Sequence, residues 1–386
     1  MADEIFTIKL HGRIDSSNAS TVEEEMLETL KGCTASSIVL DADDLEYISS
    51  AGLRIILRLK KLHPNLKIIN VSSAVYEVLE MTGFTEMLQV TKGYRKLSVE
   101  GCEVIGQGAN GKVYRLDPDT IVKVYYNADA LPEIHREREL ARKAFVLGIP
   151  TAIPYDVARV GDSYGSVFEL LNAKSFSKLI AAEPQNLDKY VVLYVDLLKK
   201  IHSTEVKPDD MPDQRAVVID WVNFLKDYLD GAKWEKLHTM VEAIPVDHHM
   251  LHGDYHTKNV MMQNGEVLLI DMDTLAQGNP VFEFASIYNA FVGFYDFDHD
   301  SSVDFQGLDY DTCITIWKKM LPLYFGTTDP AALKAVEDKA AIIGYARLMR
   351  RLIRRHGFDT EEGKKLIAHY KNQIETRIDS VDTLMF

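Results

Sequence analysis

Hydrophobic and polar positions follow one rhythm over residues 1–95. Alternation of the two types, together with short apolar runs, predicts three strands, at 5–10, 37–40 and 67–71. Apolar residues at helical spacing predict three helices, at 21–30, 52–62 and 74–81. Short strands that alternate with short helices are typical of a small α/β domain.

The rhythm changes near residue 98. A strand, a glycine-rich turn and two more strands come first, and a charged helix and a strand pair follow, at 131–147 and 155–171. Beyond residue 175 the pattern is mostly helical, apart from short strands near 250–254 and 260–272. We therefore predict an α/β domain over 1–97 and a two-lobed α+β domain over 98–386. The lobe boundary divides the second domain into 98–171 and 172–386.

Composition and charge narrow the function classes. The formal net charge is −15, so the surface as a whole repels nucleic acid. The three cysteines are few and widely spaced, which argues against a disulfide framework. The first residues, Met1 to Glu4, are acidic, unlike a signal peptide, and no apolar stretch approaches 18 residues. We expect a cytoplasmic protein with no nucleic-acid or membrane partner.

A glycine-rich segment lies between the first two strands of the second domain. Its glycines, Gly106, Gly108 and Gly111, form the pattern G-x-G-x-x-G, which alone also fits an ordinary hairpin turn. Alternating residues 113–116 follow it, so it precedes a strand and not the helix of a dinucleotide site. A glycine-rich turn between two strands is typical of a hairpin that covers the phosphates of ATP. The three glycines are therefore candidate nucleotide contacts.

Lys123 lies inside the apolar strand 121–125, twelve residues after Gly111. Burial of an ammonium group is costly unless a carboxylate pairs with it. In a kinase, a lysine at this place contacts the α- and β-phosphates and pairs with a helix glutamate. Glu137 is the predicted partner and Glu139 the second choice, while a solvated lysine on an edge strand is the alternative.

The segment from His252 to Asn259 carries the strongest signal. Asp254 can accept the proton of a hydroxyl group and orient it, and Asn259 can reach a Mg²⁺ ion from the same loop. Twelve residues later an apolar strand ends in Asp271, which can hold the Mg²⁺ ion that bridges the phosphates. Asp273 is a further carboxylate to which the sequence assigns no role.

These motifs give the second domain a resemblance to a known family. The pattern His-Gly-Asp-x-x-x-x-Asn and Ile270-Asp271 resemble the aminoglycoside and choline phosphotransferase branch of the protein-kinase-like fold. The resemblance implies two lobes, ATP against residues 168–171 with Glu169 and Leu171 as contacts, and Mg²⁺ at Asn259 and Asp271. The family usually has an aspartate where this chain has Glu283, so no role is assigned to Glu283.

The first domain resembles the STAS domain, the fold of anti-sigma-factor antagonists. The resemblance rests on residues 44–54, 70–73, 78–79 and 82–84. It implies a protein partner and a phosphorylation site at the start of a helix, where this chain has Ser50. The family's preceding aspartate is replaced by Ser49. The alternative is that both serines only cap the helix.

Two clusters of charged residues are candidate contacts for the molecule that accepts the phosphate. Aspartates recur from Asp296 to Asp311, as expected for an amine-binding loop or for a merely solvated one. Five arginines share one predicted helix: Arg347, Arg350, Arg351, Arg354 and Arg355. They are expected to form ion pairs with the acidic surface or, alternatively, to contact a phosphate-bearing substrate or a protein.

The sequence thus predicts an ATP- and Mg²⁺-dependent phosphotransferase with an alcohol group as acceptor, carried by a small and in one hypothesis amine-bearing molecule. The STAS-like domain is expected to regulate it. One alternative is a regulatory protein kinase whose acceptor is a protein serine, such as its own Ser50. Another is a scaffold that only binds nucleotide.

Overall fold

The computed structural model describes residues 5–108 and 110–386. The acidic start of the chain and Ala109 of the glycine-rich segment lie outside the described residues. The chain folds as two compact units. The first comprises Met1–Tyr114, Lys123–Asp129 and Asp156–Gly165, and the second comprises Arg115–Val122, Ala130–Tyr155 and Ser166–Phe386.

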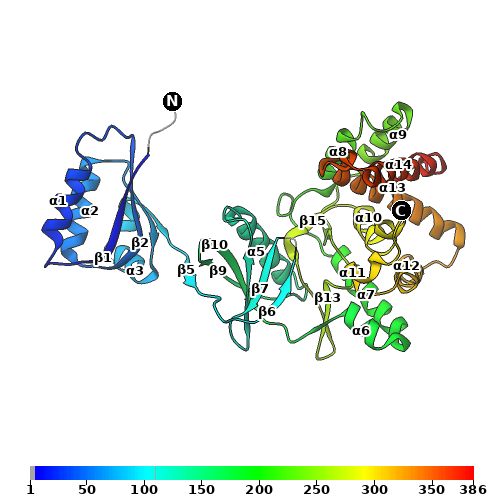
Figure 1. Cartoon of the computed structure of the whole chain (residues 1–386), viewed down its shortest axis with the longest axis horizontal. Helices are drawn as coiled ribbons and strands as arrows, with labels where there is room; N and C mark the ends of the chain where they lie inside the picture. Colours follow the sequence, from blue (N-terminus) through cyan, green and yellow to red (C-terminus); the bar gives the residue numbers. More distant parts are fainter. Residues whose placement is uncertain (1–4, 109) are drawn as a thin grey trace. The chain divides into compact units, whose positions relative to one another are not determined.

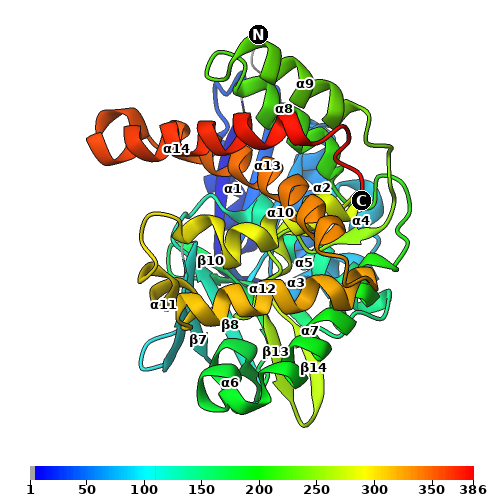
Figure 2. The same ribbon diagram turned by 90° about the vertical axis from the view of Figure 1, so that its right-hand side faces the viewer.

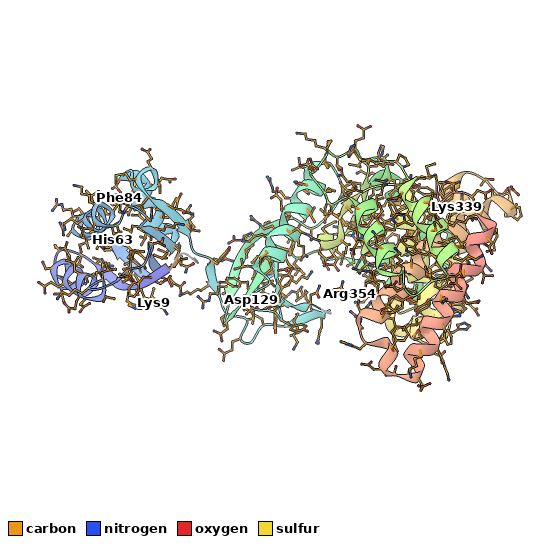
Figure 3. The ribbon with its side chains drawn as sticks, turned by 90° about the horizontal axis from the view of Figure 1, so that it is seen from above. Lys9, His63, Phe84, Asp129, Lys339 and Arg354 are labelled. Carbon is orange, nitrogen blue, oxygen red and sulfur yellow. The ribbon has the colours of Figure 1, made fainter. Side chains whose placement is uncertain are left out.

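A four-stranded parallel sheet forms the N-terminal part of the first unit. Its strands, in the order of the sheet, are β1 (Ile5–Ile14), β2 (Ser37–Ile48), β3 (Lys67–Val71) and β4 (Gln89–Lys92). Its helices are α1 (Ala19–Thr29), α2 (Ser50–Leu62), α3 (Ser73–Met81) and α4 (Phe84–Met87). Helices α1 and α2 lie side by side (Figure 1). Apolar residues of both strands and helices form one buried core, and it includes Phe84, which is labelled in Figure 3.

Strand β2 is longer than the predicted strand at 37–40. It continues through an acidic segment to Ile48, where it still pairs with Ile14 of β1, and Ala42, Leu45 and Ile48 are buried while the residues between them are not. The pairing of β1 with β2 also shifts register between Lys9 and His11. Such a shift interrupts strict alternation, which is why the sequence pattern ended the strand too early.

A second sheet has the strand order β5-β9-β10-β8-β7-β6. Its members are β5 (Arg95–Leu97), β6 (Val104–Gln107), β7 (Gly111–Arg115), β8 (Thr120–Tyr125), β9 (Pro154–Val160) and β10 (Ser163–Glu169). Gly161, in the turn between β9 and β10, has a φ of +59°, a conformation that favours glycine. Strands are found where the sequence predicts them on either side of the glycine-rich segment.

Strand β5 joins the two sheets of the first unit. It follows β4 after two residues and pairs in parallel with β9, Arg95 with Ala158 and Leu97 with Val160. The Asp43 carboxylate of β2 lies 3.0 Å from Lys96 Nζ and 3.3 Å from Arg159 Nη1. The chain therefore passes from the N-terminal sheet directly into an edge strand, without a flexible linker.

The second unit is mainly helical. Its helices are α5 (Leu131–Val146), α6 (Phe176–Ala182), α7 (Leu187–His202), α8 (Gln214–Phe224), α9 (Gly231–Glu242), α10 (Pro280–Phe291), α11 (Ser301–Gln306), α12 (Tyr310–Phe325), α13 (Pro330–Arg354) and α14 (Glu361–Arg377). Short strands are β11 (Lys174–Ser175), β12 (Met250–Leu251), β13 (Val260–Gln263), β14 (Glu266–Leu269) and β15 (Ala276–Gln277). Helix α13 packs against α10 and α14 (Figure 2). The predicted fold class, α/β followed by α+β, is confirmed, whereas the exact domain and lobe boundaries remain predictions.

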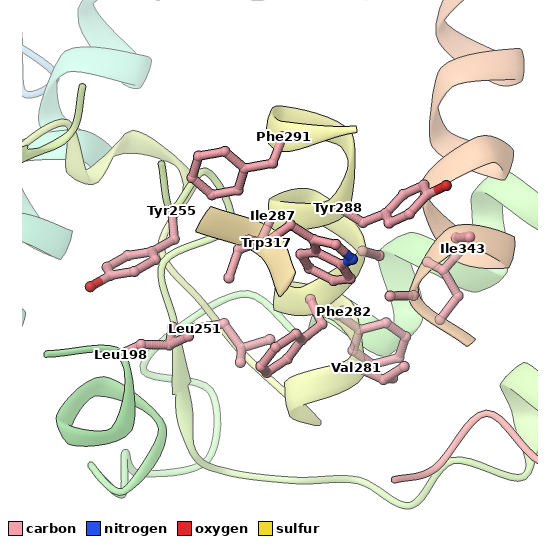
Figure 4. Close-up of a cluster of buried hydrophobic side chains, with 14 of the residues drawn as sticks. Leu198, Leu251, Tyr255, Val281, Phe282, Ile287, Tyr288, Phe291, Trp317 and Ile343 are labelled. Atoms are coloured by element: carbon pink, nitrogen blue, oxygen red, sulfur yellow. The ribbon is translucent and has the colours of Figure 1, made fainter. Parts of the chain in front are cut away.

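The core of the second unit reaches the candidate site. Helix α10 is buried along most of its length and contributes Phe282, Ile287 and other apolar side chains to this core (Figure 4). Leu251 at the end of β12 and Tyr255 in the following loop belong to the same cluster. The loop that carries Asp254 is therefore anchored in the core on both sides.

Helix α13 has 25 residues, which exceeds the roughly 20 residues needed to cross the hydrocarbon core of a bilayer. It carries several charged residues, however. Within the described ranges, no helix combines the length and the apolar composition that a membrane crossing requires.

Candidate active site

The predicted catalytic loop runs from His252 to Asn259, between β12 and β13. Its first residues are held by a carboxylate at the start of α10. Glu283 is fully buried, and it accepts hydrogen bonds from the backbone N–H groups of His252 and Gly253, the latter at 3.0 Å. His202 Nε2 lies 3.7 Å from the same carboxylate. Hydrogen bonds to a charged, buried acceptor are among the strong ones, so Glu283 fixes the path of the loop.

The carbonyl groups of the loop are held as well. Thr274 Oγ1 donates to the carbonyl of His252 at 2.7 Å. The carbonyl of Gly253 accepts from Ser286 Oγ at 2.9 Å and from Arg347 Nη1 at 3.3 Å. Arg347 also donates to Ser286 Oγ, at 2.9 Å. Thr274, Ser286 and Arg347 lie in three different elements. Together they hold the carbonyl groups of the two residues that precede Asp254.

Position 253 requires glycine. Its φ is +82°, and a Cβ atom there would lie 2.5 Å from the carbonyl oxygen of Thr274. Both the backbone conformation and the close approach exclude a larger side chain without movement of the backbone. The tight turn allows Asp254 to follow a buried strand immediately and still reach the surface.

The Asp254 carboxylate is partly exposed, and His256 Nε2 lies 3.4 Å from it. The Nδ1 atom of His256 accepts a hydrogen bond from the backbone N–H of Lys258 at 3.2 Å, so the imidazole proton is on Nε2, facing Asp254. Burial would raise the pKa of Asp254, but the hydrogen bond from His256 and the nearby charge of Arg347 act in the opposite direction, and the pKa is lowered to about 2. Asp254 is therefore ionised at neutral pH.

Asn259 links the catalytic loop to the strand that ends in Asp271. Its Nδ2 atom donates to the carbonyl of Asp254 at 3.0 Å, and its own carbonyl accepts from the backbone N–H of Ile270 at 3.0 Å. Because the donor end of the side chain is used within the loop, its oxygen is the end that would bind a cation. Asp271 has a left-handed conformation, with φ 64° and ψ 70°, and is exposed. Such backbone strain is concentrated at functional sites.

The chemistry of Asn259 and Asp271 fits a magnesium ion. Both residues offer oxygen ligands, which Mg²⁺ prefers. Among the described residues, no group of three or more histidine, cysteine, aspartate or glutamate side chains is placed to hold a metal ion. Mg²⁺ in kinase-type sites is bound by one or two protein side chains and by substrate phosphates and water, so a complete protein cage is not required.

The predicted nucleotide-binding glycines differ in what surrounds them. A Cβ atom at Gly111 would lie 2.2 Å from the carbonyl oxygen of Val124, so close packing between strands requires glycine there. A Cβ atom at Gly106 would make ordinary contacts with Val113. Gly108 donates its N–H to the carbonyl of Gly111 at 3.0 Å and has open space beside its Cα. Gly108 is therefore the position with the clearest room for a ligand.

Lys123 lies in β8, partly buried, with Nζ 5.4 Å from the centre of the Tyr125 ring. Glu137 is a buried residue of α5. The second choice, Glu139, is exposed and pairs with Arg142 at 3.0 Å. The proposed pairing of Lys123 with Glu137 stays a prediction.

The predicted adenine-contacting segment follows β10. Glu169 closes this strand, and its carboxylate accepts from the backbone N–H of Ile153 at 3.4 Å. Leu171 is partly buried, two residues beyond it. Their roles as ATP contacts also stay predictions.

The two serines at the start of α2 have different tasks. Ser49 is the N-cap, and its side chain accepts from the backbone N–H of Ala51 at 3.2 Å. Ser50 is the first residue of the helix and is exposed. Within the described residues, no hydrogen bond of its hydroxyl group is found. Capping therefore accounts for Ser49 and leaves Ser50 accessible.

Two aspartates of the acidic run from Asp296 to Asp311 have structural partners within the protein. Asp296 Oδ2 accepts from Tyr345 Oη at 2.5 Å and lies 2.8 Å from His369 Nε2. Asp309 caps α12 by accepting from the backbone N–H of Thr312 at 2.8 Å. An amine-binding role would therefore rest on the remaining aspartates of this run.

The sequence patterns missed several residues of the site. Among them are His256, Thr274, Ser286 and Arg347, none of which was given a role at the catalytic loop. Glu283 was noticed but given none. One signal was available, because a lone carboxylate in the otherwise apolar stretch 281–285 is expected only where polar partners are buried with it.

Comparisons with known proteins match both parts of the chain. A model of the phosphotransferase enzyme family matches residues 101–305, and a model of the STAS domain matches residues 2–98. A protein of Bordetella bronchiseptica named BtrV, a candidate anti-sigma factor antagonist, is 36% identical over 86 residues. The match covers 21% of this chain and 72% of that protein.

Solved structures that resemble most of this chain have low sequence identity to it. A thermostable mutant of aminoglycoside phosphotransferase APH(4)-Ia, in ternary complex with AMP-PNP and hygromycin B, is 14% identical with a TM-score of 0.50. The match covers 72% of this chain and 93% of that one. A choline/ethanolamine kinase family protein from Mesorhizobium loti is 13% identical with a TM-score of 0.46, over 72% of this chain and 88% of that one.

Proposed function

Because the chain belongs to the phosphotransferase enzyme family and begins with a STAS domain, we propose that it is an ATP-dependent kinase that phosphorylates the hydroxyl group of a small molecule. Both resemblances drawn from the sequence are confirmed by the family matches. In the proposed reaction, the bond between the β- and γ-phosphates of ATP breaks and a bond from the acceptor oxygen to the γ-phosphorus forms. The hydroxyl proton passes to Asp254, and ADP leaves.

The geometry of Asp254 carries this proposal. Its loop is fixed from both sides by Glu283, Thr274, Ser286 and Arg347, while its carboxylate reaches the surface. A carboxylate with a pKa of about 2 is a weak base. Phosphoryl transfer passes through a loose transition state that asks more for orientation of the hydroxyl group than for early removal of its proton. Asp254 suits that task, because it is ionised and rigidly placed.

Nucleotide and metal would be held by the predicted set of residues. We assign the phosphates of ATP to the segment with Gly106, Gly108 and Gly111 and to Lys123, with Glu137 as the partner of Lys123. We assign the adenine to the segment with Glu169 and Leu171. Mg²⁺ would be held by Asn259 and Asp271, where it would neutralise phosphate charge. The complex of APH(4)-Ia with AMP-PNP supports a nucleotide in this fold.

The STAS domain is proposed to bind a protein partner and to regulate the kinase. The exposed Ser50 at the N-terminus of α2 supports a switch, since a phosphate group of roughly −2 charge is favourable at a helix N-terminus and alters the surface offered to a partner. Transfer from ATP to Ser50 itself is the competing function. The amine-bearing acceptor is the less favoured class of small molecule, because Asp296 and Asp309 are already engaged.

The test is a transfer assay with labelled ATP and Mg²⁺ on the full chain. The Asp254→Asn variant is expected to lose activity by about 10³-fold, because the neutral amide cannot accept the proton. Nucleotide binding, followed by fluorescence of an ATP analogue, is expected to remain. Undiminished transfer by Asp254→Asn would overturn the mechanism, and label on Ser50 without any added acceptor would favour the protein-kinase function.

A further inference from the structure

The arginines of α13 approach the catalytic loop. Arg347 Nη1 contacts the carbonyl of Gly253, the residue before Asp254, and its guanidinium lies 5.7 Å from the centre of the Trp221 ring. Arg351 and Arg355 follow at intervals of four residues. Residues at this spacing share one face of a helix and rise by about 6 Å per step. Arg347 and Arg351 therefore share one face of α13 that begins beside Asp254. Arg355, the C-cap of the helix, lies close enough for its charge to act on Arg351, and the three residues are here called the arginine row.

The residues of the arginine row differ from Arg350, their neighbour on α13, in their ion pairs. Arg350 pairs with Asp220 at 3.0 Å. Within the part of the chain that the structure describes, Arg347, Arg351 and Arg355 form no ion pair with a carboxylate. Among the residues that the structure describes, the prediction that the five arginines pair with the acidic surface is thus met only by Arg350.

The like charges of the row act on each other. Although Arg351 reaches the surface, partial burial and then the charges of Arg355 and Arg347 lower the pKa of its guanidinium, whereas Asp254 acts in the opposite direction. Like charges four residues apart destabilise a helix. The helix dipole favours cations in the last turn of α13, which holds Arg351 and Arg354, but it does not explain Arg347, one turn before Arg351. An anion placed on the row would remove the repulsion.

The acidic surroundings make this row more unusual. The chain carries a net charge of −15, so carboxylates for pairing are abundant, yet among the described residues the only carboxylate that acts on the row is that of Asp254, the proposed base, and it forms no ion pair with these arginines. Arg347 is instead oriented by Ser286 and by the Gly253 carbonyl, which leaves the remaining N–H groups of its guanidinium for another acceptor. Guanidinium groups bind phosphate and carboxylate oxygens through paired N–H donors.

We propose that the arginine row is an anion subsite for the acceptor, so that the molecule phosphorylated by this enzyme carries a phosphate or carboxylate group besides its reacting hydroxyl. The inference rests on the proposed kinase function and deepens it. Arg347 lies next to Asp254 and Arg351 about 6 Å further along the helix, so the anionic group and the hydroxyl are separated by a few bonds. A small metabolite fits this spacing better than a protein segment does.

Direct binding of inorganic phosphate tests the subsite. The full chain is first saturated with AMP-PNP and Mg²⁺ so that the nucleotide site is occupied. Phosphate is then titrated by calorimetry and by fluorescence, for which Trp221 beneath Arg347 is a built-in reporter. We expect weak binding that falls with ionic strength and is weakened about tenfold by Arg351→Ala, in line with the loss of a hydrogen bond to a charged group.

Three variants control the experiment. Arg351→Lys keeps the charge and is expected to retain part of the affinity. Arg350→Ala removes the same charge from the same helix, but from a residue already paired with Asp220, and is expected to leave phosphate binding within about twofold of wild type. Arg354→Ala removes an exposed charge at the end of α13 (Figure 3) and is expected to have a similarly small effect.

Acceptor assays then identify the anion. Glycerol, glycerol 3-phosphate, glycerate and ethanolamine share a hydroxyl group and differ in charge. Transfer to the phosphate or the carboxylate compound, with a KM that rises about tenfold in Arg351→Ala at nearly constant kcat, supports the subsite. Equal phosphate binding by wild type and Arg351→Ala, no phosphate binding by wild type, or transfer only to ethanolamine or to a protein serine overturns it. Loss of AMP-PNP binding by the wild type would instead contradict the proposed function.

Discussion

The catalytic loop and the start of α2 are both polar sites that follow a buried strand, but they are held in different ways. The groups that fix His252 and Gly253 come from residues 22 to 94 positions further along the chain. The start of α2 is capped by Ser49, which reaches an N–H group only two positions away. One site depends on the whole second unit, and the other is built almost entirely from its own segment.

This difference suits the two proposed tasks. A catalytic carboxylate must keep one position, and it gains this from buried, charge-assisted hydrogen bonds that also tie the loop to the core. A site of modification must be reached by a partner, so its hydroxyl has to stay on the surface. Mutations at the first site should affect folding and activity together, whereas those at the second should affect neither strongly.

The largest effect is expected from Glu283→Ala. The change leaves the buried N–H groups of His252 and Gly253 without their acceptor and places His202 opposite a cavity. We expect the free energy of unfolding of the second unit to fall by about 3 kcal/mol, from two or more buried groups left unsatisfied. Thermal unfolding, read together with kcat, measures this change.

The exposed Glu235 provides a matched control in the same unit. Glu235→Ala is expected to change the free energy of unfolding by no more than about 0.5 kcal/mol. If Glu283→Ala were as stable and as active as Glu235→Ala, the loop would not depend on the distant carboxylate, and the contrast between the two sites would be lost.

An intermediate effect is expected from His256→Ala, which removes the hydrogen bond that lowers the pKa of Asp254. Without this hydrogen bond, the tendency of burial to raise the pKa of Asp254 is less strongly countered, so the pKa rises. The acid limb of the pH profile of kcat/KM therefore moves to higher pH. His256→Gln offers an amide N–H in its place and should return the limb part of the way. A profile that is identical in all three proteins would show that His256 does not position or tune Asp254.

The low pKa of Asp254 also predicts how the stability of the protein changes with pH. Asp254 is more acidic in the folded chain, with a pKa of about 2, than in an unfolded chain, where aspartate titrates near about 3.9. Its contribution to stability is therefore present above about pH 4 and is lost as the pH falls toward 2.

The smallest effect is expected at α2. Ser49→Ala removes the N-cap and should cost about 1 kcal/mol, whereas Ser50→Ala should leave the helix nearly unchanged. Hydrogen exchange at the first-turn amides of α2 is expected to quicken about fivefold in Ser49→Ala only. Equal rates of hydrogen exchange in the two variants would mean that Ser49 and Ser50 both cap α2. That result would support the alternative in which the two serines only cap the helix.

The contrast also explains what the sequence could predict. The catalytic loop, the end of the strand at Asp271 and the glycines were found because each motif is contiguous and has a characteristic spacing. Ser286 and Arg347 were not assigned to the loop, because only the packing of α10 and α13 brings them to Gly253. The end of β2 was misjudged for a similar reason, since its pairing with β1, and not its local pattern, keeps an acidic segment extended.

The position of strand β5 determines where the chain can be shortened to obtain the phosphotransferase domain alone. A chain that began at residue 98 would lack β5, and Ala158 to Val160 of β9 would become the edge of the sheet. Val157, Ala158 and Val160 are buried, so the new edge would offer unpaired backbone groups beside apolar side chains. Exposed edges of this kind recruit strands from other molecules and cause aggregation. The N-terminal segment therefore protects the phosphotransferase sheet, and an isolated second domain will need Arg95 to Leu97 to remain monodisperse.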